Sequence, residues 1–193
     1  MMRYLLAAML GLLAVQAPAE DREVAGVRLP ATVQVPGLET PLRLNGAGVR
    51  RKFFFRIYVA ALYLPQPQHD AAAILDAAPP WRMLMHFLYD EVSKEKLATA
   101  WEEGFRANLD AKAYRAVAGR LQDFIALFTT LREGDEVLLD HLPGRGVRVV
   151  IGGEEQGLIP GDDFATALLS VWLGPEPVTE SLKKALLAAD RSP

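Results

Sequence analysis

Cationic and aromatic side chains cluster in one short stretch of the chain. It reads Arg50-Arg51-Lys52-Phe53-Phe54-Phe55-Arg56-Ile57-Tyr58 and contains no acidic residue. An arginine fork binds carboxylate or phenolate oxygens through charge-assisted hydrogen bonds, and a tyrosine hydroxyl can add a neutral one. Beside apolar rings, such groups suit a ligand that carries one anionic group on an apolar body.

Arg50 and Tyr58 are the first candidate pair for that anion. A fully extended strand would separate residues this far apart in sequence by roughly 26 Å. A shared anion therefore requires a turn near Arg50–Lys52, with residues 46–49 folded back as the neighbouring strand. Gly46 and Gly48 permit such a bend. In the alternative interpretation, Arg50–Lys52 is a solvated turn without a ligand.

Arg56 is the second cationic candidate. By the two-residue period of a strand it shares a face with Phe54 and Tyr58, and we expect that face to be buried. A buried arginine needs an anion or several acceptors. Its partner is expected to be either a bound carboxylate or a structural acid such as Asp90 or Glu91.

Other kinds of chemistry find little support in the sequence. The chain has no cysteine, which excludes disulfides and thiolate-ligated metals. His69, His86 and His141 lie far apart, so no metal site is expected, and no motif for a nucleotide or another cofactor is present. The net charge of -3 is dispersed, which argues against nucleic-acid binding. The Asp162-Asp163 pair is interpreted as helix capping.

The N-terminus is typical of a secretory leader. A short basic start precedes an apolar run over residues 4–15, and Ala17-Pro18-Ala19 provides a small-x-small cleavage pattern. The run is shorter than the roughly 20 residues that a membrane span needs. We expect residues 1–19 to be a cleaved signal peptide, with an uncleaved membrane anchor as the alternative, and residues 20–193 to form one domain. The mature protein would then be exported without stable membrane insertion, and periplasmic in a Gram-negative bacterium.

The remaining pattern predicts the elements that must position these residues. Alternation with Pro and Gly punctuation predicts strands from 27 to 64, and Gly46 and Gly48 mark a bulge or a close backbone approach. The segment 53–64 reads as a strand covered on both faces. Further strands are expected at 81–89, 136–140, 146–151 and 155–158. Helices are expected at 71–77, from Ser93 to about 109, at 113–128 and 164–173, and from Thr179 to 187. This order favours an α+β domain, an antiparallel sheet with helices on one face.

The stretch from Leu44 to Leu64 resembles the signature of the chalcone isomerase-like family. Gly46-x-Gly48-x-Arg50 matches that family's glycine turn and arginine, and an aromatic strand with a late Leu62-Tyr63 follows. The helix pair from 93 to 128, the 158–161 turn and the tail from 164 to 183 occur in the family's order. The resemblance implies an open-faced antiparallel sheet with a layer of helices, enclosing an apolar cleft.

What the resemblance implies for the site differs between branches of that family. Arg50 matches the arginine that guides the phenolate in the enzyme and meets a carboxylate in the lipid binders. Tyr58 falls where the fatty-acid binders have tyrosine and the enzyme has threonine. Leu97 and Gly104 fall near the enzyme's active-site Tyr and Asn and offer no polar side chain. The expected cleft lining is Phe54, Leu97, Trp101 and Gly104, and the alternative for Trp101 is an ordinary core position.

Three functions follow as hypotheses. The first is non-catalytic binding of a small apolar or amphipathic ligand, such as a fatty acid, by Arg50, Tyr58 and Arg56. The second is an intramolecular lyase or isomerase that uses Arg50 as electrophile, and it needs an ordered polar network that the sequence does not supply. The third is a protein-interaction module without a ligand.

Overall fold

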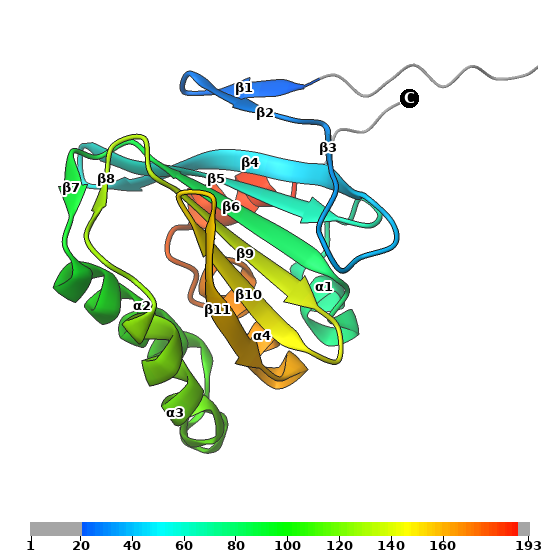
Figure 1. Ribbon diagram of the computed structural model, residues 1–193, viewed down its shortest axis with the longest axis vertical. Helices are drawn as coiled ribbons and strands as arrows, with labels where there is room; N and C mark the ends of the chain where they lie inside the picture. Colours follow the sequence, from blue (N-terminus) through cyan, green and yellow to red (C-terminus); the bar gives the residue numbers. More distant parts are fainter. Residues whose placement is uncertain (1–20, 189–193) are drawn as a thin grey trace, which may run out of the picture.

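The computed structural model describes residues 21–188, so the expected signal peptide lies outside the described residues. Its centre is a seven-stranded sheet with the order β11-β10-β9-β6-β5-β4-β3 (Figure 1). Every neighbouring pair in this sheet is antiparallel. The sheet strands are β3 (Thr32–Val33), β4 (Leu42–Lys52), β5 (Phe55–Leu64), β6 (Trp81–Phe87), β9 (Glu136–Leu142), β10 (Gly146–Ile151) and β11 (Glu154–Pro160). Two small ribbons accompany it, β1 (Arg22–Val24) with β2 (Val27–Leu29), and β7 (Glu91–Val92) with β8 (Leu131–Arg132).

The helices begin close to where their capping residues predict. They are α1 (Ala71–Ala77), α2 (Lys94–Asn108), α3 (Ala111–Ala126), α4 (Asp162–Leu173) and α5 (Glu180–Leu186). Asp70, Ser93 and Thr179 cap α1, α2 and α5 as expected, each accepting hydrogen bonds from the first-turn amides. None of the helices between residues 21 and 188 combines the length and apolarity that crossing a bilayer requires.

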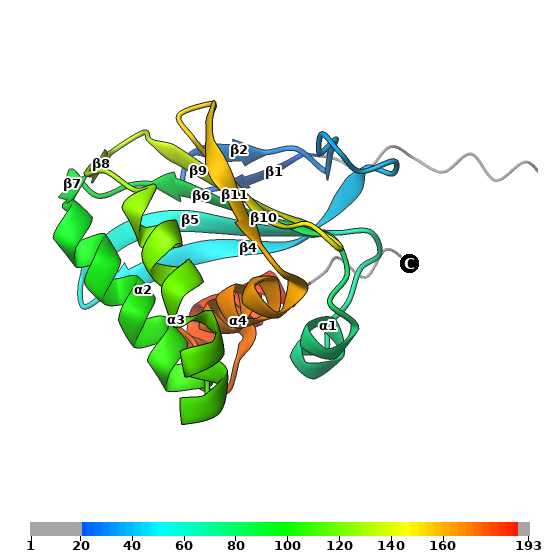
Figure 2. The ribbon, with the colours of Figure 1, turned by 60° about the horizontal axis from the view of Figure 1, so that its bottom comes forward.

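The helices cover one face of the sheet, and the β1–β2 ribbon covers part of the other (Figure 2). The larger core lies between the sheet and the helices, and its most buried rings include Phe105, Phe124 and Trp172. The smaller core lies on the opposite face of the sheet. It includes Leu29 of β2, Tyr63 of β5 and Leu84 of β6. Side chains of β5 enter both cores, so both of its faces are buried from Ile57 to Leu64. The predicted α+β architecture with helices on one face is confirmed.

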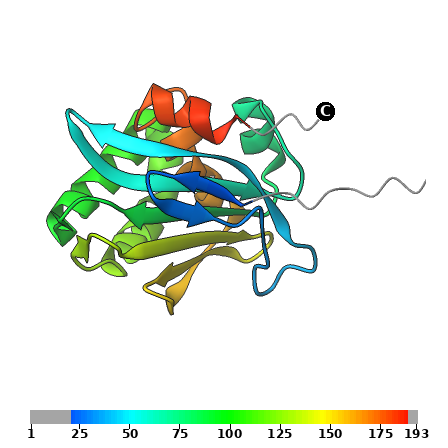
Figure 3. The same ribbon diagram turned by 90° about the horizontal axis from the view of Figure 1, so that it is seen from above.

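The glycines of the Gly46-x-Gly48 motif lie inside strand β4 and not in a turn. A Cβ on Gly46 would collide with the backbone oxygen of Ala185, and one on Gly48 would lie 2.6 Å from the Ala185 Cβ. Both glycines therefore let α5 approach β4 (Figure 3). Asn45 forms a bulge just before them, and its amide bonds the backbone oxygens of Gln68 and Leu186 at 2.9 and 2.8 Å. The predicted bulge and close approach are both confirmed.

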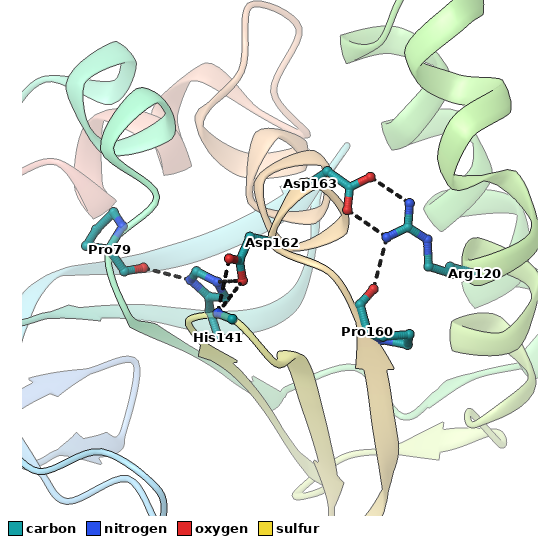
Figure 4. A network of polar contacts seen from close by, with 7 residues as sticks. Pro79, Arg120, His141, Pro160, Asp162 and Asp163 are labelled. Carbon is teal, nitrogen blue, oxygen red and sulfur yellow. Dashed lines mark hydrogen bonds and ion pairs between the residues drawn. The ribbon is translucent and has the colours of Figure 1, made fainter.

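The interpretation of Asp162-Asp163 as caps was wrong, because Gly161 is the N-cap of α4 and makes no side-chain cap bond. Asp162 instead accepts from His141 Nε2 at 3.0 Å and from the Gly144 amide at 2.9 Å. Asp163 pairs with both terminal nitrogens of Arg120 at 2.7 and 2.6 Å (Figure 4). Both carboxylates tie the start of α4 to other elements.

Candidate ligand-binding site

Arg50 and Tyr58 lie directly opposite each other on β4 and β5. The Arg50 guanidinium carbon is 5.5 Å from the centre of the Tyr58 ring, within the range of a cation–π contact. The expected convergence of the two side chains and the pairing of residues 46–49 with the following strand are present. The turn lies later than expected, at Phe53 and Phe54.

Arg50 is a partly buried cation without a counter-ion among residues 21–188. Its Nε is buried and has no hydrogen-bond partner there. A buried donor without an acceptor is costly, more so when it belongs to a charged group. The pairing with the Tyr58 ring offsets part of this cost, and an anion beside Arg50 would remove it.

Tyr58 is 4% exposed, and its hydroxyl accepts a hydrogen bond from Trp172 Nε1 at 3.1 Å. Burial raises the pKa of Tyr58 above its ordinary value, against an opposing effect of Arg50. The phenol therefore stays protonated at neutral pH. Trp172 occupies an acceptor position of the oxygen and leaves its hydrogen to donate. Tyr58 can thus donate to a ligand oxygen while Trp172 orients it.

A cleft with a volume of about 480 Å³ opens at the end of the sheet where Arg50 and Tyr58 lie, within the size range of small-molecule sites. Its buried part consists of Ile57, Tyr58, Phe87 and Leu97, from β5, β6 and α2. Phe55 packs edge-on against Tyr89 at its rim, with ring centres 5.4 Å apart. The remaining lining residues are Arg50, Lys52, Phe53, Glu91, Val92, Glu95, Lys96, Thr99, Ala100 and Glu103.

Two of the acidic groups at the rim are already engaged. Glu91 pairs with Arg132 at 2.9 Å across the β7–β8 ribbon. Glu95 lies in the first turn of α2, where a backbone hydrogen bond and the Ser93 hydroxyl lower the pKa of its carboxyl. Neither reaches Arg50 within ion-pair distance. The other charged lining residues, Lys52, Lys96 and Glu103, are exposed, so the buried wall of the cleft is apolar apart from the Tyr58 hydroxyl, with the partly buried Arg50 beside it.

The structure separates the two arginines proposed for the site. Arg50 lines the cleft, whereas Arg56 is exposed and has no acidic partner among the described residues. The expectation of a buried Arg56 was wrong. The pairing shifts between Arg50 and Arg51, which leaves Ile57 as an extra residue in β5. Such a bulge breaks the two-residue alternation, so Arg56 does not follow Tyr58 into the cleft.

The expected cleft lining holds for Leu97 only. Phe54 lies in the β4–β5 turn and is 96% exposed. Trp101 is buried against Phe124, Phe128 and Trp172 in the helical core. A Cβ on Gly104 would lie 2.9 Å from Val171, so this glycine brings α2 close to α4. These three residues serve the turn and the helix packing and lie outside the cleft.

Sequence reasoning missed Phe87 and Tyr89 as parts of the site. Phe87 pairs with Tyr58 across β5 and β6, and their ring centres are 5.6 Å apart. Only the register of these strands brings the two rings together. Within residues 21–188, no group of three or more His, Asp or Glu side chains is arranged to hold a metal ion.

A curled antiparallel sheet, backed by helices and carrying an arginine on a cleft wall, defines the class of fold to which this chain belongs. The chain is a member of the chalcone isomerase-like family, whose model matches residues 21–188. Among solved structures, it is similar to a fatty-acid binding protein of Arabidopsis thaliana, with a TM-score of 0.64 and 16% identity. The match covers 84% of this chain and 92% of that one. Comparison with curated proteins finds none that matches.

Proposed function

We propose that this protein binds a small amphipathic carboxylate, such as a fatty acid, without converting it. The observation that carries the proposal is the partly buried, unpaired Arg50 on the wall of an apolar cleft. A carboxylate there accepts hydrogen bonds from Arg50 and from the Tyr58 hydroxyl. The acyl chain lies against Ile57, Phe87 and Leu97, where its burial supplies the larger part of the affinity.

The similar Arabidopsis thaliana structure is a fatty-acid binding protein, which supports the same class of ligand. The open cleft also favours a ligand over a pure protein-interaction module, whose cleft would be filled by side chains. The volume of about 480 Å³ accommodates a chain-like molecule of moderate size.

The competing isomerase function needs a polar network that holds the reacting groups. Leu97 is apolar, and the Thr99 hydroxyl donates to the Glu95 backbone oxygen at 3.0 Å. Asn108 lies away from the cleft and bonds Gly104 and Glu176. Decay of naringenin chalcone faster than the spontaneous rate, lost on Arg50→Ala, would establish the isomerase instead.

Binding is tested by native mass spectrometry of the purified protein and by titration with fatty acids of different lengths. We expect a carboxylate to copurify or bind, and Arg50→Ala to weaken binding strongly. Arg51→Ala is the matched control, because Arg51 is the exposed neighbour of Arg50 outside the cleft lining. Absence of binding across the panel, or equal affinity of wild type and Arg50→Ala, contradicts the proposal.

Export is a separate part of the proposal. The leader-like residues 1–19 would direct the domain out of the cytoplasm, and into the periplasm of a Gram-negative cell. Cell fractionation and the N-terminal sequence of the mature protein test this. A mature chain that starts near Glu20 is expected, and a full-length cytoplasmic chain would refute export.

A further inference from the structure

The turn between β4 and β5 lies at the edge of the molecule (Figure 3). It exposes three consecutive phenylalanines. Phe53 is 86% exposed, Phe54 96% and Phe55 54%. The other exposed large hydrophobic residue between positions 21 and 188 is Leu158, at 38%. A single exposed leucine is ordinary, whereas adjacent exposed aromatic rings indicate an interaction surface.

The backbone of this turn gives no structural reason for phenylalanine. Phe53 has a φ of 55°, in the left-handed region where a bulky residue is strained. Two-residue hairpin turns favour glycine, asparagine or aspartate for this reason. A strained aromatic residue that is also almost fully exposed contributes little to folding. The exposed ring of Phe53 is therefore available for contact with another molecule.

Exposed cations surround the phenylalanines. Arg51, Lys52 and Arg56 are exposed and form no ion pair within the described part of the chain. Residues 50–56 contain no acid, although the whole chain carries a net charge of -3. Aromatic rings beside several basic residues suit the interface of a bilayer that contains anionic lipids.

The small area of the exposed β4–β5 turn favours a membrane over another protein as its partner. A phenylalanine buries at most about 250 Å², so three of them fall short of the roughly 800 Å² per partner of a specific protein interface. A bilayer surface sets no such minimum, since rings enter the acyl boundary and basic side chains meet headgroup phosphates separately.

We propose that the β4–β5 turn docks this protein on the surface of bilayers that contain anionic phospholipids. Phe53 and Phe54 enter the boundary between headgroups and acyl chains, and Arg51, Lys52 and Arg56 contact the phosphates. Phe53 and Phe55 also line the cleft, so docking presents the cleft opening to the membrane. The docking requires no ligand in the cleft and stands apart from the proposed binding function.

Cosedimentation with vesicles tests the docking. Wild type is expected to bind vesicles of phosphatidylcholine mixed with phosphatidylglycerol, more weakly at high salt, and to bind pure phosphatidylcholine poorly. Phe53→Gly/Phe54→Ser should abolish binding without lowering the melting temperature, because glycine accepts the φ of the turn. Leu158→Ser is the matched control and should bind as wild type does.

A second pair of variants tests the charges. Arg51→Ser/Lys52→Ser should weaken binding to the anionic vesicles by at least about tenfold. Lys112→Ser/Arg115→Ser removes the same charge from the exposed start of α3, away from the turn, and should have a much smaller effect. Arg50→Ala should still bind vesicles even if it loses the carboxylate, which separates this proposal from the binding function.

Three results would overturn the docking. One is a wild type that stays in solution with anionic vesicles. Another is a Phe53→Gly/Phe54→Ser variant that binds as wild type does. The third is a self-associated wild type that becomes monomeric in that variant without binding vesicles, which would make a second copy the partner.

Discussion

At the scale of single residues, the site depends on hydrogen-bond donors that the described part of the protein leaves unused. Arg50 has a buried Nε without an acceptor within residues 21–188, and the Tyr58 hydroxyl receives a hydrogen bond from Trp172. Among the other described residues, the buried charged side chains are paired. Arg82 and Arg148 both bond the fully buried Asp140, at 2.6 Å for the closest contact of each. This contrast identifies Arg50 as the cation available for a ligand.

The contribution of Tyr58 can be measured on its own. Tyr58→Phe removes the hydrogen bond that the phenol donates to the carboxylate and should weaken fatty-acid binding by about 1.5–3 kcal/mol, the range for hydrogen bonds to charged groups. The Trp172 Nε1 also loses its acceptor, so a modest loss of stability should accompany the change. Isothermal titration calorimetry and thermal melts read out the two effects.

Tyr114→Phe is the control for that measurement, because Tyr114 lies on α3 against Arg106, outside the residues that line the cleft. Its affinity should equal that of wild type. If Tyr58→Phe also leaves the affinity unchanged, then the hydroxyl does not meet the ligand and serves only Trp172.

At the scale of elements, the close approach of α5 to β4 and the ties at the start of α4 hold the helical layer on the sheet. Gly46 and Gly48 leave room for α5, and Asn45 bonds the end of that helix. Asp162 and Asp163 attach α4 to β9 through His141 and to α3 through Arg120. The glycine motif and the acidic pair therefore both serve the packing of the helices on the sheet.

Gly46→Ala should lower the free energy of unfolding by about 1–3 kcal/mol or more, because the added methyl overlaps α5 backbone that cannot move aside cheaply. Gly119→Ala is the matched control, and it should instead raise the free energy of unfolding. A Cβ on Gly119 meets nothing within 4 Å, and alanine is favoured over glycine inside a helix by about 0.5–1 kcal/mol. Urea unfolding of both variants measures this, and a neutral Gly46→Ala would refute the close-approach argument.

The start of α4 should make stability depend on pH in the acid range. Hydrogen bonds from His141 and from Arg120 lower the pKa values of Asp162 and Asp163, respectively, below the usual value for aspartate. A depressed folded-state pKa contributes stability that is fully present above the unfolded-state pKa. That stability is lost as the pH falls through the folded-state pKa.

Urea midpoints measured across the acid range check this dependence. Asp162→Asn/Asp163→Asn should be less stable than wild type at neutral pH and should lose less stability on acidification. Asp76→Asn, at an exposed position of α1, should retain the wild-type dependence. An unchanged pH profile in the double variant would place the acid sensitivity elsewhere.

At the scale of the whole molecule, the cleft lies where the β4–β5 hairpin, β6 and α2 meet, while the two cores lie on opposite faces of the sheet. The site is thus built on well-packed elements, and its strained parts are confined to one hairpin. Residues whose local preferences conflict with the fold are expected at functional positions. Two such residues lie in this hairpin, Arg50 with its unpaired Nε and Phe53 with its left-handed backbone conformation.

Arg50→Ala should therefore leave the ligand-free protein as stable as wild type or more so, because the cost of the buried, unpaired donor exceeds the stabilisation from its contact with the Tyr58 ring, and both are removed. Fatty acid at a hundred times its Kd should stabilise wild type by about 2.7 kcal/mol through linkage. The same concentration should stabilise Arg50→Ala much less. Thermal melts with and without ligand measure both quantities, and a strongly destabilised ligand-free Arg50→Ala would assign a structural role to Arg50.

The sequence by itself determined the class of fold and most element positions, and it indicated that Arg50 and Tyr58 can converge only across a hairpin. These follow from local signals, namely the alternation at the start of β4, the continuous apolar run of β5, the caps Asp70, Ser93 and Thr179, and the reach of an extended chain. The tertiary structure alone decided which faces look into the cleft. The bulge at Ile57 turned Arg56 to solvent, strand register brought Phe87 beside Tyr58, and helix packing took Trp101 and Gly104 into the core. Such outcomes depend on contacts between residues distant in sequence, which no local pattern encodes.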